Sequence, residues 1–153
     1  MKNASSLLLS VVFAAGLPAG EPAGSPAKYL GGTIPALAAH TSGRLAVSDP
    51  HCLVFTSRQA TIRVPYDRIN QLEYGQTVDR RLLEAVLISP LLILSKKRAH
   101  YVTVGYEAED GRQQAMLFRV GKGDIRAILV SLETRSGRKV TYQDEEARKA
   151  GKG

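Results

Sequence analysis

Short segments in which apolar and polar residues alternate, separated by turn residues, occupy much of the chain from Tyr29 to Val120. Asp49-Pro50 and Asp110-Gly111 have the composition of tight turns. An alternation with a period of two residues is typical of a β-strand that is buried on one face. The pattern therefore predicts a mainly β (α+β) fold of about seven strands, near residues 29–37, 43–48, 51–57, 60–66, 68–76, 100–108 and 113–120.

Several of the predicted strands contain residues that indicate a buried face, an end, a bulge or a bend. Leu53 and Phe55 fall on one face of their segment, and Pro65 should lie at a strand end because proline cannot donate a ladder hydrogen bond. The spacing from Ile69 to Leu72 indicates a bulge in the segment at 68–76. We expect the Gly31-Gly32 pair to mark a bend in the first strand.

One helix is predicted after the last of these strands. Asp124 lies in its first turn, where the helix dipole favours an anion, and Gly137 suits the position just after its end. Four apolar residues recur at i, i+3, i+4 and i+7: Ile125, Ile128, Leu129 and Leu132. Burying them would contribute about 6 to 12 kcal/mol before conformational entropy is subtracted, so this helix should pack on the sheet and close one end of it.

An apolar run at 85–95 interrupts the alternating pattern and is followed at once by Lys96, Lys97 and Arg98. Pro90 divides the run, because proline ends a helix at the preceding residue. We expect a short helical insert near 79–89 with Asp79 as its N-cap, followed by a buried strand at 91–95.

The N-terminus has the composition of an export signal. Lys2 precedes an apolar segment at 7–15, and small residues and prolines follow it. The apolar segment is shorter than the roughly 20 residues that span a bilayer, so a permanent anchor is the weaker alternative. We expect a signal peptide at 1–23, a flexible lead-in at 24–28, a folded domain at 29–140 and a disordered tail at 141–153, in an exported (periplasmic or secreted) protein.

The residues that usually carry catalysis are sparse. Cys52 is the only cysteine, and the three histidines are scattered along the chain. His51 and Cys52 are adjacent, but neighbouring residues of a strand point to opposite faces, so they make a poor nucleophile and base pair. We therefore expect no enzyme activity, no metal site and no cofactor.

The order of elements resembles a pleckstrin-homology-like (PH-like) fold over roughly residues 29–137. The segment GRLAVSDPHCLVFTS at 43–57 is similar to the G-x-L…S…L-x-F pattern of GRAM and bacterial PH-like domains, and IRVPYDRINQLEY at 62–74 is similar to the strand that follows it there. This resemblance implies a bent, partly open antiparallel barrel closed by one C-terminal helix. It also implies a platform that binds proteins or, in some members, lipids.

Two features depart from the lipid-binding members of that family. Their first hairpin is basic, whereas the corresponding connection here, residues 36–44, holds only Arg44, and the chain has no tryptophan. Head-group binding at the usual place is therefore not expected.

The formal net charge of +7 is compatible with an anionic partner or with solubility alone, and export makes nucleic acid the least expected partner. We expect a non-enzymatic binding module that mediates protein–protein interaction through its sheet edge or its insert, with an unknown partner. The alternative is peripheral association with an anionic membrane through the insert. The candidate binding residues are Arg80, Arg81, Lys96, Lys97 and Arg98, which could equally form a solvated turn and a helix start.

Overall fold

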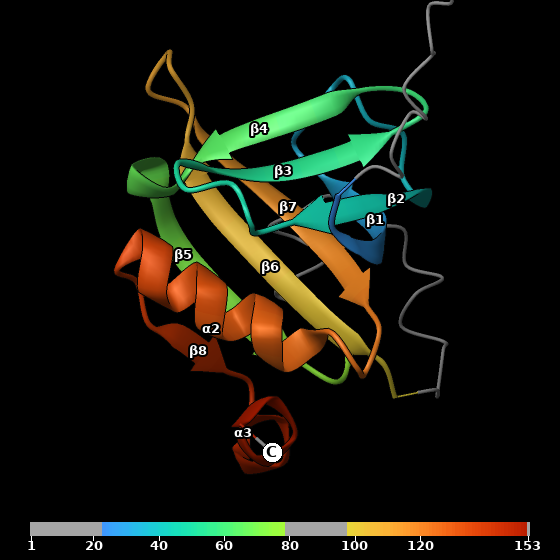
Figure 1. The fold of residues 1–153 in the computed structure, drawn as a ribbon, viewed down its shortest axis with the longest axis vertical. Coiled ribbons are helices and arrows are strands. Elements are labelled where there is room, and N and C mark those ends of the chain that lie inside the picture. Colours follow the sequence, from blue (N-terminus) through green and yellow to red (C-terminus); the bar gives the residue numbers. More distant parts are fainter. Residues whose placement is uncertain (1–22, 79–97, 153) are drawn as a thin grey trace, which may run out of the picture.

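The computed structural model describes residues 23–78 and 98–152, and within them one eight-stranded mixed sheet carries two C-terminal helices (Figure 1). The strand order is β4-β3-β2-β1-β7-β6-β5-β8, and the sheet is not closed. The strands are β1 (Ser25–Gly32), β2 (Thr41–Ala46), β3 (Cys52–Ser57), β4 (Thr61–Pro65), β5 (Ile69–Gly75), β6 (His100–Glu107), β7 (Gln113–Val120) and β8 (Val140–Tyr142). The helices are α2 (Ile125–Ser136) and α3 (Glu145–Lys152), with a 3-10 turn η1 (Tyr66–Arg68). The predicted mainly β class is confirmed.

Two antiparallel meanders make up most of the sheet. Strands β1 to β4 pair in sequence order, strands β5 to β7 do the same, and β1 joins the two groups by pairing with β7. The register of β1 against β7 shifts between Tyr29 and Gly31, which confirms the predicted bend. Figure 1 shows β3 and β4 running across the direction of β5 and β6, so the bent sheet wraps around its own core.

The local predictions for the strands agree with the structure. Leu53 and Phe55 are both buried, Pro65 ends β4, and the β5 register shifts between Ile69 and Gln71. The turn between β6 and β7 has Gly111 at φ 79°, with its amide hydrogen-bonded to the Ala108 carbonyl. Local signals in the sequence, namely alternation, a proline and a turn dipeptide, were therefore sufficient to predict these features.

Helix α2 packs on the sheet with the predicted face. Its four buried residues are Ile125, Ile128, Leu129 and Leu132, each at most 2% exposed. The helix ends at Gly137, which has a left-handed φ of 69° and donates its amide hydrogen to the Glu133 carbonyl. Asp124 is the N-cap, but its carboxylate accepts a hydrogen bond from the Ser25 hydroxyl (2.8 Å) instead of capping the helix.

The two ends of the domain differ from the prediction. Residues 25–28, expected in the flexible lead-in, are the first half of β1, which ends at Gly32 and not near residue 37. Although Pro26 and its small neighbours have low β-propensity, β2 pairs with Ser25–Tyr29 on one side and β7 pairs with Ala27–Gly32 on the other.

The C-terminal residues 141–152, expected as a disordered tail, form most of β8 and all of α3. Strand β8 adds a parallel pairing to β5, so the sheet has eight strands and is not wholly antiparallel. Helix α3 buries only Ala147 and Gly151, which are too small to give an apolar stripe in the sequence. The predicted insert helix at 79–89 and strand at 91–95 lie outside the described residues, as does nearly all of the predicted signal peptide.

Candidate functional site

Basic side chains gather where β1, β7 and the start of β6 lie next to one another in the sheet. Lys28 in β1 is directly opposite Arg119 in β7, and Ser42 of β2 is its partner on the other side. Like charges directly opposite in an antiparallel pair are destabilising. An anion bound between Lys28 and Arg119 would remove this repulsion.

A pocket of about 570 Å³ surrounds that pair, and we call it the strand pocket. Its cationic lining residues are Lys28, Arg98 and Arg119, and His100 at the start of β6 lines it as well. Arg98 Nη1 lies 2.9 Å from Glu146 Oε2 of α3, and both side chains are 67% exposed. An ion pair this exposed contributes little to stability, so Arg98 can exchange Glu146 for another anion at low cost.

A second pocket of about 650 Å³ adjoins the first through His100, and we call it the helix pocket. Lys122 from the β7–α2 turn, Arg126 from the first turn of α2 and Lys149 from α3 line it, together with Gln76. Of the residues described, no aspartate or glutamate lines either pocket. The two pockets together form the basic surface, whose members are Lys28, Arg98, His100, Arg119, Lys122, Arg126 and Lys149.

His100 is held by an aromatic neighbour beneath the basic surface. Its Nδ1 lies 2.6 Å from the Tyr74 hydroxyl, and the two rings stack at 6.0 Å with an interplanar angle of 15°. Burial lowers the pKa of His100, and the positive charge of Lys122 lowers it further. The imidazole is therefore neutral near pH 7, and when the tyrosine donates to Nδ1 the ring hydrogen is on Nε2.

The position of Lys149 depends on how closely α3 approaches the sheet. A Cβ atom on Gly151 would lie 2.7 Å from Tyr142 Cε1 and 3.2 Å from Leu129 Cδ1, so only glycine permits this contact. Ala147, one helical turn earlier, is 1% exposed. Lys152 Nζ lies 5.6 Å from the centre of the Tyr142 ring, where a cation–π attraction adds to the packing.

Of the predicted binding residues, Arg98 belongs to the basic surface, whereas Arg80, Arg81, Lys96 and Lys97 lie outside the described residues. Sequence reasoning missed the other cations of the surface because they are scattered from residue 28 to residue 149. The only signals in the sequence were the net charge and the lysine between two glycines at 121–123.

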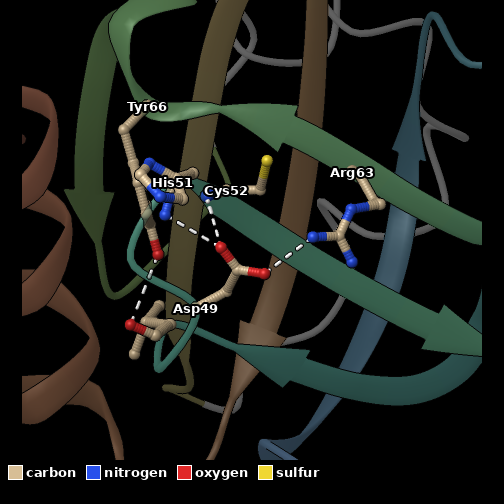
Figure 2. A network of polar contacts seen from close by, with 6 residues as sticks. Asp49, His51, Cys52, Arg63 and Tyr66 are labelled. Atoms are coloured by element: carbon tan, nitrogen blue, oxygen red, sulfur yellow. Dashed lines mark hydrogen bonds and ion pairs between the residues drawn. The ribbon is translucent and has the colours of Figure 1, made fainter.

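A separate polar network lies at the β2–β3 turn (Figure 2), and none of its labelled residues lines the strand pocket or the helix pocket. The amides of His51 and Cys52 donate to Asp49 Oδ1 (2.8 and 3.0 Å), and Arg63 donates to Oδ2 (2.6 Å). These hydrogen bonds, that of the His51 amide most of all, hold the pKa of Asp49 below its usual value. Figure 2 shows the Cys52 sulfur pointing away from this carboxylate, so the hydrogen bonds of Asp49 to the two backbone amides hold the β2–β3 turn.

Residues 23–78 and 98–152 contain no cluster of three or more His, Cys, Asp or Glu side chains that could hold a metal ion. In the same residues no helix has the length and apolar character needed to cross a bilayer.

Comparison with known proteins gave no matching family model and no matching curated protein.

Proposed function

We propose that the protein is an exported, non-enzymatic PH-like binding module that attaches peripherally to an anionic membrane surface. The observation that carries this proposal is the basic surface: six cations from six separate segments line two adjoining pockets, and no described lining residue of either pocket is acidic. Five of them form no ion pair with a described carboxylate: Lys28, Arg119, Lys122, Arg126 and Lys149.

The PH-like part of the proposal is supported by the order of elements. A four-stranded meander, a three-stranded meander and a helix packed on them by four apolar side chains follow one another along the chain. The export part is supported by the cationic start and apolar segment of the first 15 residues.

The physical basis of attachment is electrostatic attraction combined with apolar insertion. A cation near an anionic leaflet contributes about 1 kcal/mol, and the attraction decays over a Debye length of about 10 Å at 0.1 M salt. The apolar run at 85–95 lies in the sequence between Val78 and Arg98. Arg98 lines the strand pocket, so the run is close in sequence to the basic surface. Basic residues beside an apolar segment strengthen interfacial binding.

Vesicle co-sedimentation tests the proposal. The full chain should bind vesicles of phosphatidylcholine mixed with phosphatidylglycerol and should not bind phosphatidylcholine alone. Replacing Lys28 and Arg119 by serine should weaken binding roughly tenfold or more, and replacing Lys96, Lys97 and Arg98 by serine should do the same. A matched control replaces Arg58 and Lys139, which are exposed and do not line either pocket. Absence of binding to the anionic vesicles, or equal weakening by the control, would contradict the proposal.

A protein partner bound along a sheet edge is the second candidate. Strand β4 is at one end of the sheet order and pairs only with β3 among the described strands, so its outer edge can accept another strand. The two candidates differ in their response to salt. Membrane attachment through cations should weaken steeply as ionic strength rises, whereas an edge-strand contact should persist.

A further inference from the structure

We propose that the helix pocket is a binding site for a phosphate monoester. This inference deepens the proposed function and rests on it for the lipid source of the ligand, since a membrane lipid or a soluble metabolite can carry the same group. The site consists of Lys122, Arg126 and Lys149, with His100 as a neutral hydrogen-bond donor.

The charge of the pocket favours a dianion. Its three cations form no ion pair with a described carboxylate, and no acidic residue belongs to its described lining. A phosphate monoester carries about −1.5 to −2 charges at pH 7, whereas the phosphodiester of a common phospholipid carries one. The planar guanidinium of arginine can donate two parallel hydrogen bonds to phosphate oxygens, and the ammonium group of lysine binds them as a compact positive charge. The monoester is therefore the better match.

Two carboxylates close in sequence to the lining residues have partners outside the helix pocket. Asp124 Oδ1 accepts the Ser25 hydroxyl, and Glu146 pairs with Arg98. The β7–α2 turn also leaves room for a ligand, because no atom lies within 4 Å of the position that a Cβ would take on Gly123. A phosphate with an attached organic group fits a pocket of about 650 Å³.

His100 provides a readout specific to this pocket. Burial and Lys122 lower its pKa in the unliganded protein, and a dianion bound beside the ring should raise it. The other histidines, His40 and His51, do not line the helix pocket and serve as internal controls. General screening by salt would not move the His100 pKa alone.

The experiment follows the three histidine rings of the full chain by NMR as inorganic phosphate and then glycerol 3-phosphate are added at constant ionic strength. We expect saturable shifts at His100 and a rise in its pKa of roughly one unit or more, with little change at His40 and His51. Replacing Lys122 and Arg126 by serine should weaken binding about tenfold or more. The control with Arg58 and Lys139 replaced removes the same charge elsewhere and should bind normally.

Vesicles of phosphatidylcholine with phosphatidic acid, compared with phosphatidylglycerol, identify the source of the phosphate. Preference for phosphatidic acid indicates a lipid ligand. Saturable binding of glycerol 3-phosphate without binding to any vesicle supports the pocket and contradicts membrane attachment. The absence of a phosphate effect on His100, or equal weakening of phosphate binding by both double variants, overturns the phosphate site. Vesicle binding observed together with either result leaves membrane attachment standing.

Discussion

Leu132 is the most deeply buried of the four α2 residues that pack on the sheet, with 0% exposure. Replacing it by alanine removes three carbon atoms, worth about 2.4 kcal/mol at roughly 0.8 kcal/mol each. The cavity left behind adds to this loss, and buried Leu→Ala changes cost about 2–5 kcal/mol in total. We expect about 3–4 kcal/mol, a large fraction of the roughly 5–15 kcal/mol that stabilises a domain.

Urea unfolding followed by far-ultraviolet circular dichroism measures this loss, because the chain has no tryptophan to report by fluorescence. Val130 on the same helix is 57% exposed, so Val130→Ala is the matched control and should change the free energy of unfolding by less than about 0.5 kcal/mol. If Leu132→Ala costs under about 1 kcal/mol, or if the two variants lose the same amount, then α2 does not close this core.

Two further predictions concern the basic surface. Because the folded protein lowers the pKa of His100, the unfolded chain binds the proton more readily, so the free energy of unfolding should fall as the pH drops through the range around 6.5. His100→Gln should reduce that slope in urea titrations at several pH values, and an unchanged slope would show that His100 is not its source. Gly151→Val should undock α3, since a Cβ there meets Tyr142 at 2.7 Å. Hydrogen exchange in residues 145–152 should then accelerate and phosphate binding should weaken, whereas Lys139→Ser should change neither, and slow exchange in the valine variant would refute the packing argument.

Elements with a strong local pattern were predictable from the sequence. Burial that repeats along one element produced the alternation around Leu53 and Phe55 and the spacing from Ile125 to Leu132. The Asp110-Gly111 turn was predictable because its residue types favour a tight turn. Period-two and period-3.6 burial follow directly from strand and helix geometry. The positions of β3, α2 and the β6–β7 turn were therefore readable from neighbouring residues.

The ends of the domain were not predictable in this way. Residues 25–28 carry no strand pattern, and they are extended because β2 and β7 lie on their two sides. Helix α3 buries only an alanine and a glycine, so its contact with Tyr142 depends on a close approach of the backbone. Two such small residues produce no recognisable hydrophobic periodicity in the sequence. Both features depend on partners distant in the sequence.

The sequence by itself determined a basic chain of mainly β structure with one amphipathic helix, since composition and local periodicity are properties of the chain alone. Only the tertiary structure decided which cations become neighbours. Lys28 meets Arg119 because β1 pairs with β7, and Lys149 joins Lys122 and Arg126 because α3 lies beside α2. These contacts join segments that are far apart in the chain, and no pattern within either segment specifies the other.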